Sequence, residues 1–381
     1  MGALILEHFK CFHYFELPTA SLTVLTGFNA AGKSTALQSI LLMSQTLRRG
    51  LFRDKLVLNG PLAELGSTGD VLNRDARSAP VRLGFRNGDD HVAWSFEPER
   101  SSDNRELRLA EGVIRWGGER NRWSGSIWPL DQMVPPFIES IRDAICVGAS
   151  RTGSVEAYPY PDDPDLPVGD VGLHGEYAPH WYVERADEEV ETARRCPSDE
   201  TETVRGQVDA WLSSLFPGAA ASADALKGVA LYRSRFRMGR GGEATRPSNV
   251  GYGLSYAFPL LVALLTARAG ATIVVDSPEA HLHPRAQSGM GRLIARMAAA
   301  GLRIFVETHS DHLLSGIRLG VREGHLRHDQ AIVHFFRDAA GDGGNPDIVT
   351  LRLDPEGAIS GWPEGFFDQA ERDLAILSGW A

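Results

Sequence analysis

Residues 27–35, with the sequence GFNAAGKST, have the types and spacing of a phosphate-binding loop. An apolar run at 21–27 predicts a strand before this loop, and a helical repeat at 33–50 predicts a helix after it. Backbone amides at such a helix start hold phosphates, Lys33 reaches the terminal phosphates, and Ser34 can ligate Mg²⁺. The loop residues that we predict to bind the nucleotide are Gly27, Asn29, Ala30, Ala31, Gly32, Lys33, Ser34 and Thr35.

Two further side chains are expected to lie near the same phosphates. Asp276 ends the apolar strand TIVVD at 272–276, so we predict that it holds Mg²⁺ together with Ser34. His309 ends the next strand, RIFVETHS at 303–310, where a histidine can touch the γ-phosphate or orient the attacking water. A histidine in such a place is more often a structural hydrogen-bonding group, so the pattern alone leaves both roles open.

The elements that must position these residues follow an α/β order at both ends of the chain. Short alternating runs at 55–125 predict antiparallel hairpins, and helices are expected at 132–147 and 204–216. A helix after Pro259, the strand at 272–276, a helix at 285–301 and the strand at 303–310 then predict a parallel sheet. The last residues suggest a small hairpin followed by a helix.

Composition limits the function classes. The net charge of −10 argues against coating of nucleic acid by the whole surface. A local patch is still possible, because Arg233, Arg235 and Arg237 alternate at strand spacing, although a solvated sheet edge is the more common explanation of such a pattern. No apolar run is long enough for a membrane helix, so we expect a soluble cytoplasmic protein. Three widely separated cysteines suggest neither a disulfide framework nor a zinc site.

The ordered motifs resemble ABC-type ATPases of the SMC, RecF and OLD branch. They are the loop at 27–35, NVGYGLSYAFPLL at 249–261, VVDSPEAHLHP at 274–284 and VETHSDHLL at 306–314. More narrowly, SPEAHLHPRAQ and the terminal WPEGFFDQ resemble prokaryotic AAA-family ATPases with an uncharacterised C-terminal domain. The resemblance implies an ABC-type α/β head in four segments: an N-terminal ATPase lobe (1–54), a β-rich and helical insertion (55–224), a C-terminal ATPase lobe (225–330) and a small extension (331–381).

The resemblance also assigns roles to individual residues. Ser255 matches the signature serine that closes over the nucleotide of a second subunit in an ATP-driven dimer. Ser277 stands where such ATPases usually have the catalytic glutamate, and Glu279 lies two residues further on. We therefore predict slow hydrolysis with Glu279, His309 and Asp276 as the catalytic residues. Arg151 matches an arginine that either braces a loop or senses phosphate.

The biological role that the resemblance implies is control of a partner effector, plausibly a nuclease on a separate chain, in anti-phage defence. The expected cofactors are ATP and Mg²⁺, and the expected assembly is a homodimer or a higher homo-oligomer, with possible DNA contact through the arginines at 233–237. The alternatives are an ATP-gated scaffold that does not hydrolyse ATP and a RecF-like DNA-repair ATPase. The residues after His309 show no cluster of acidic metal ligands that would favour a nuclease on this chain.

Overall fold

The computed structural model describes residues 2–98, 106–129, 132–153, 155–239, 241–338 and 345–379. Its centre is a mainly parallel sheet with the strand order β16-β15-β3-β14-β13-β9. These strands are β3 (Leu22–Gly27), β9 (Ile145–Val147), β13 (Thr272–Asp276), β14 (Arg303–Glu307), β15 (Ala331–Asp338) and β16 (Asp347–Arg352), and only β16 runs antiparallel to its neighbour. The α/β class is therefore confirmed.

Both faces of this sheet are covered, which explains why its strands are almost continuously apolar. Val274 and Phe305 point into one core cluster, while their neighbours Ile273 and Ile304 point into a second cluster on the opposite face. All four side chains are at most 3% exposed. The two cores leave the ends of the strands as the accessible parts of the sheet.

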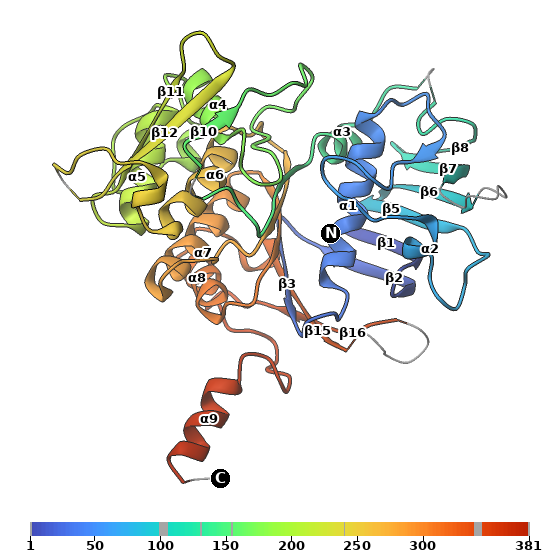
Figure 1. The fold of residues 1–381 in the computed structure, drawn as a ribbon. Coiled ribbons are helices and arrows are strands. Elements are labelled where there is room, and N and C mark those ends of the chain that lie inside the picture. Colours follow the sequence, from blue (N-terminus) through green and yellow to red (C-terminus); the bar gives the residue numbers. More distant parts are fainter. Residues whose placement is uncertain are drawn as a thin grey trace.

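The first face packs on helices α1 (Lys33–Arg48) and α3 (Pro136–Arg142), and these helices pack in turn on an antiparallel sheet. The strand order of that sheet is β2-β1-β5-β6-β7-β4, with β8 paired to β7. Its strands are β1 (Gly2–Phe9), β2 (Phe12–Thr19), β4 (Lys55–Leu56), β5 (Val81–Asn87), β6 (Asp90–Pro98), β7 (Leu107–Trp116) and β8 (Glu119–Trp123). The short helix α2 (Thr68–Val71) lies beside β2 (Figure 1).

The second face packs on the helices at the left of Figure 1, which are α4 (Ala178–Glu184), α5 (Val204–Leu215), α6 (Tyr252–Thr266), α7 (Pro284–Ala299) and α8 (Asp311–Arg322). A small sheet of β10 (Ala157–Pro159), β12 (Leu231–Arg237) and β11 (Ala220–Ala225) packs against α4 and α5. The helix α9 (Gln369–Leu377) extends away from this body. None of the helices in the described part of the chain is long and apolar enough to span a membrane.

Several of the expected elements have different bounds. The strand expected at 303–310 ends at Glu307, so His309 lies in the loop that follows it. The helix expected at 132–147 ends at Arg142, and Ile145–Val147 instead form the edge strand of the parallel sheet. The helix expected after Pro259 starts at Tyr252, so the proline lies inside it. Because α6 is buried along most of its length, tertiary packing outweighs the local preference against an interior proline.

Each of the two large sheets contains strands from more than one of the four segments expected from the sequence. The antiparallel sheet joins β1 and β2 of segment 1–54 to strands of segment 55–224. Segment 55–224 supplies β9 to the parallel sheet, and segment 331–381 supplies β15, which lies directly beside the phosphate-loop strand β3. The extension is thus part of the sheet that positions the site.

Candidate nucleotide site

The phosphate loop lies where the sequence predicts it, between β3 and α1. Gly27 has φ 127°, and a Cβ there would lie 2.1 Å from the carbonyl oxygen of Phe336 on β15, so only glycine fits. Gly32 has φ 104° and starts α1 by accepting the backbone N–H of Ala36. Ala30 also has a positive φ, of 61°. These backbone conformations form a tight turn before the N-terminus of α1, a type of place where backbone amides can bind an anion.

Lys33 is held inside this loop. Its side chain is 4% exposed, and Nζ donates to the carbonyl oxygens of Phe28 at 2.7 Å and Gly27 at 3.1 Å. Burial lowers the pKa of the ammonium, although the carboxylates of Glu307 and Asp276 act in the opposite direction. Among the described residues, the ammonium is thus held by two carbonyl oxygens and by a carboxylate at 4.0 Å.

Glu307 is the site residue that the sequence reasoning missed. It ends β14, and its carboxylate accepts the Ser34 hydroxyl at 2.9 and 3.1 Å and lies 4.0 Å from Lys33 Nζ. Burial and the nearby Asp276 carboxylate both raise the pKa of Glu307. Asp276 and Glu307 are direct partners in the register of β13 and β14. The available signal was the acid in VETHS, at the carboxyl end of a strand that neighbours both β3 and β13.

Ser277 and Glu279 have different contacts. Ser277 has φ 49° and donates its hydroxyl to Asp276 Oδ1 at 2.8 Å. Glu279 Oε1 accepts the backbone N–H of His309 at 2.9 Å, so these two predicted catalytic residues lie together. Glu279 Oε2 is buried and has no hydrogen-bond partner among the described residues. Burial lowers the pKa of His309, with a further contribution from Lys33.

Arg151 braces the loop that follows β13. It is 4% exposed, and its guanidinium donates to the carbonyl oxygens of Asp276 at 2.7 Å and Ser277 at 3.1 Å. The same group donates to Gly148 at 2.9 Å and to Tyr256 of α6 at 3.4 Å. Burial lowers its pKa to about 10. The arginine therefore ties α6 to the loop that carries Asp276, as the bracing role requires.

Ser255 lies in the first part of α6, on its buried side. The side chain is 3% exposed, and its hydroxyl has no hydrogen-bond partner in the described part of the chain. The exposed residues at the start of this helix are Gly251 and Tyr252. Ser255 is thus near the helix end that the resemblance assigns to a second subunit, but its side chain points into its own core.

A pocket of about 400 Å³ lies over the phosphate loop. Besides the loop residues and Glu307, it is lined by His309, by Lys10 and Cys11 from the turn between β1 and β2, and by Gln38 of α1. Lys10 donates to the Gln38 amide oxygen at 2.8 Å. The antiparallel sheet therefore supplies one wall of the site through this turn.

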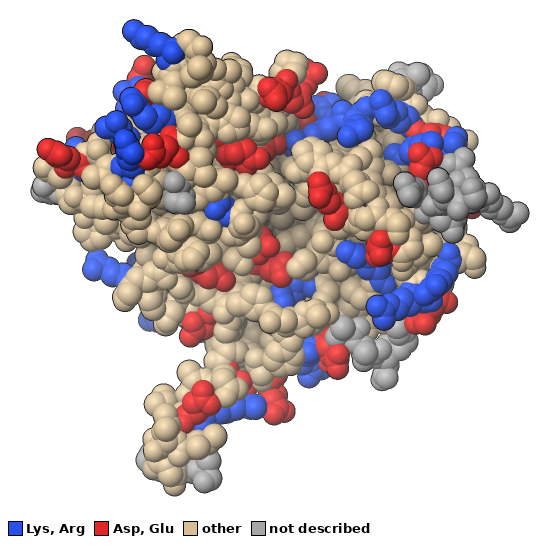
Figure 2. Space-filling model, viewed as in Figure 1, with Lys and Arg blue, Asp and Glu red and all other residues tan. Residues whose placement is uncertain are grey.

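The arginines of β12 share one face of their strand, as predicted, because the side chains between them are buried. Arg233 is paired with Asp224 at 2.8 Å, and Arg237 lies close enough to Asp209 to lower that acid's pKa, although burial raises it more. Over the part of the molecule where β11 and β12 lie, Figure 2 shows blue and red side chains next to each other. The patch is partly neutralised by its own acids.

Comparison with protein families gives two matches. Residues 155–315 match a family described as "AAA domain, putative AbiEii toxin, Type IV TA system". Residues 326–377, which include WPEGFFDQ, match a family described as a protein of unknown function (DUF3696). The first match contains Asp276, Glu279 and His309, and the phosphate loop precedes it. None of the curated proteins that were searched matches the sequence.

Three solved structures are similar at a low level. An SMC head bound to the C-terminal winged-helix domain of ScpA has 13% identity and a TM-score of 0.49, and the match covers 92% of this chain and 97% of that one. The SMC head domain from Thermotoga maritima has 13% identity and a TM-score of 0.43, covering 91% and 97%. A head domain bound to a ScpA domain from Pyrococcus furiosus has 11% identity and a TM-score of 0.47, covering 99% and 100%. Residues 155–315 of this chain are therefore similar to the AAA domain family, and a strand, loop and helix with the geometry of a phosphate-binding loop precede them in the sequence.

Proposed function

We propose that this protein binds Mg·ATP at the phosphate loop and hydrolyses it slowly. The observation that carries the proposal is the buried Lys33 ammonium, which lies inside the loop beside a pocket of about 400 Å³. The loop amides and the start of α1 favour anionic phosphates in that pocket, and Lys33 can exchange its two carbonyl contacts for phosphate oxygens.

The oxygen atoms around Ser34 fit Mg²⁺, which prefers oxygen ligands and would neutralise phosphate charge when bound. Ser34, Glu307 and Asp276 are the residues that would hold it. The Asp276 carboxylate contributes to the raised pKa of Glu307, and a divalent cation between the two acids would offset this effect. Ser34 already contacts the Glu307 carboxylate, so only local changes are needed for these groups to share an ion.

Hydrolysis needs a group that accepts a proton from the attacking water. We assign this role to Glu279, with His309 beside it, because Glu279 Oε2 is an acceptor without a partner in the described chain. Ser277 has no acidic group, and its hydroxyl already donates a hydrogen bond to Asp276. The burial of Glu279 Oε2 also favours the alternative, an ATP-gated scaffold without turnover, because water must gain access to that oxygen first.

Phosphate release by purified protein at saturating Mg·ATP separates the enzyme from the scaffold. We expect slow release that is lost in Lys33→Ala. Phosphate release below detection in the wild-type protein would overturn the hydrolysis proposal. ATP binding without phosphate release in the same samples would support the alternative, a scaffold that binds ATP without hydrolysing it.

We further propose that ATP closes a homodimer in which the start of α6 of one subunit covers the nucleotide of the other. Gly251 and Tyr252 are exposed there, and Arg151 connects this helix to the loop that carries Asp276. Ser255 reaches the nucleotide only if the first turn of α6 rearranges, which would also give its unpaired hydroxyl a partner. Light scattering with and without ATP tests the dimer, and Ser255→Ala should weaken it if that rearrangement occurs.

The cellular role that we propose is cytoplasmic control of a separate effector protein, such as a nuclease, in anti-phage defence. The matched family's description names the AbiEii toxin of a type IV toxin–antitoxin system, which supports a growth-controlling role. DNA contact through Arg233, Arg235 and Arg237 belongs to this proposal. If Arg233→Glu with Arg235→Glu leaves DNA affinity and its salt dependence unchanged, the contact is refuted.

A further inference from the structure

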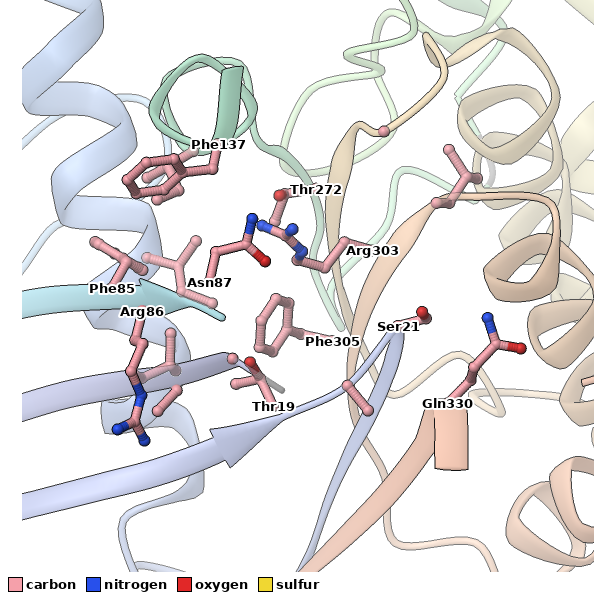
Figure 3. Close-up of a pocket in the computed structure, with 18 of the residues that line it drawn as sticks. Thr19, Ser21, Phe85, Arg86, Asn87, Phe137, Thr272, Arg303, Phe305 and Gln330 are labelled. Carbon is pink, nitrogen blue, oxygen red and sulfur yellow. The ribbon is translucent and has the colours of Figure 1, made fainter. Parts of the chain in front are cut away.

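A second pocket, of about 490 Å³, lies at the amino end of the parallel sheet, opposite the phosphate loop (Figure 3). The strands β13 and β14 begin there with Thr272 and Arg303, and they end at Asp276 and Glu307 in the nucleotide site. The antiparallel sheet forms the other wall through Gly2 of β1 and Asn87 at the end of β5. The pocket therefore lies between the two sheets and is separate from the nucleotide site.

One part of this pocket is apolar. Phe305, Phe85 and Phe137 line it and are 3%, 6% and 7% exposed, and Leu4, Ile40 and Ile141 complete the surface. All six belong to the core cluster between the two sheets. In Figure 3 the rings of Phe85 and Phe137 lie on one side, and the ring of Phe305 lies below Asn87. A flat apolar group can replace water against these rings with a gain in free energy.

Another part of the pocket carries a positive charge, on Arg303, that no described residue balances. The Arg303 guanidinium is half-buried and has no ion pair or hydrogen bond within the described ranges, and burial alone lowers its pKa. Of the other charged groups that line the pocket, Arg86 pairs with Glu16 at 3.0 Å and Asp329 pairs with Arg327. Arg303 is therefore the cation left for a ligand, because a desolvated guanidinium without an anion is unfavourable.

Neutral polar groups surround this guanidinium. Figure 3 shows the side chains of Arg303 and Asn87 directed toward the same part of the pocket, beside Thr272. The Asn87 amide also has no hydrogen-bond partner within the described ranges, whereas Thr272 shares a hydrogen bond of 3.2 Å with Ser140 of α3. One cation with a nearby amide can donate several hydrogen bonds to a single carboxylate.

We propose that this pocket binds a small monocarboxylate with a flat apolar body, with the carboxylate on Arg303 and Asn87 and the body against Phe305, Phe85 and Phe137. The single unbalanced charge matches one carboxylate, and the volume lies in the range of small-molecule sites. The ligand would contact both sheets at once and would stabilise their packing. This proposal does not depend on ATP binding.

Isothermal titration calorimetry with three matched pairs of probes tests the proposal: benzoate, phenylacetate and 3-phenylpropionate, each beside its uncharged amide. We expect at least one acid to bind the wild-type protein at least tenfold more tightly than its amide. Binding of none of the acids, or equal binding of acid and amide in all three pairs, would overturn the proposal.

Two variants locate the bound carboxylate. Arg303→Gln removes the charge, and Asn87→Asp places a competing carboxylate next to Arg303 at an exposed position where folding is not at risk. We expect each to weaken binding of the acid at least tenfold, whereas Arg322→Gln, on the exposed side of α8, changes it less than twofold. If Arg303→Gln does not fold, the test rests on Asn87→Asp alone. An affinity of Asn87→Asp for the acid equal to that of the wild type would refute the proposed site.

Discussion

An arginine lies at each end of the parallel sheet, buried at the carboxyl end and half-buried at the amino end, and the two arginines differ in what they contact. Arg151, at the carboxyl end, donates to the carbonyl oxygens of four residues, whereas Arg303, at the amino end, has no partner among the described residues. Burial lowers the pKa of both. The first arginine braces two parts of the fold, and the second is left with an unsatisfied charge. The contacts of the two side chains therefore distinguish a structural brace from the binding site that we propose.

The largest effect is expected when the brace is removed. Arg151→Gln should lower the free energy of unfolding by about 3 kcal/mol, because buried carbonyl oxygens lose their donors. Urea unfolding followed by circular dichroism measures this change. A loss below about 1 kcal/mol would mean that these hydrogen bonds contribute little, and the contrast with Arg303 would fail.

A change at the predicted base should come next. Glu279→Gln can still accept the His309 N–H, so the loop keeps its position, but the amide cannot take a proton from water. We expect turnover to fall about tenfold or more with ATP affinity nearly unchanged. Glu119→Gln, on the exposed strand β8, is the matched control. Equal turnover in Glu279→Gln and wild type would exclude Glu279 as the base.

A smaller effect concerns the charge balance at the carboxyl end. The raised pKa of Glu307 favours its protonated form in the folded state, so the corresponding stability is present at low pH and is lost as pH rises through that pKa. Without metal, the free energy of unfolding of Glu307→Gln should therefore fall less than that of the wild type as pH rises through this pKa. Added Mg²⁺ should restore the lost stability in the wild type and not in the variant. Parallel melting curves at stepped pH measure the difference, and identical pH dependence of the two proteins would contradict it.

The smallest effect is expected at the amino end without ligand. Arg303→Gln removes an unpaired cation, so the free energy of unfolding should change by less than about 0.5 kcal/mol or should increase, and ATP affinity should stay within twofold. Urea unfolding of Arg303→Gln and Arg151→Gln under the same conditions compares the two changes in the free energy of unfolding directly. A loss near that of Arg151→Gln would show that Arg303 has a structural partner.

The parts that the sequence predicts well are those set by local spacing. Apolar runs and a glycine pattern predict the strand, loop and helix around Lys33, the strand that ends at Asp276 and the strand that begins at Arg303. The end of the last strand at Glu307 was not predicted. The role of Glu307 requires the knowledge that β14 lies between β3 and β13, which is a long-range pairing. The strand at Ile145–Val147 and the buried side of Ser255 likewise depend on packing partners distant in sequence.

The pocket around Arg303 could not be predicted at all, because its walls come from both ends and the middle of the chain. Gly2, Asn87 and Phe137 meet the starts of β13 and β14 only after two sheets have packed. No pattern of spacing within the sequence predicts that these residues line one pocket. The unbalanced charge of Arg303 is likewise a property of its surroundings in the fold.

The most direct test of the central claim is equilibrium binding of Mg·ATP to wild-type protein and to Lys33→Ala, measured by calorimetry with the folding of both proteins verified. We predict binding of one ATP per chain to the wild type and affinity about 100-fold lower in the variant, because Lys33 loses its charge-assisted hydrogen bonds to phosphate. Wild-type protein that does not bind Mg·ATP, or equal affinity in Lys33→Ala, would contradict the account.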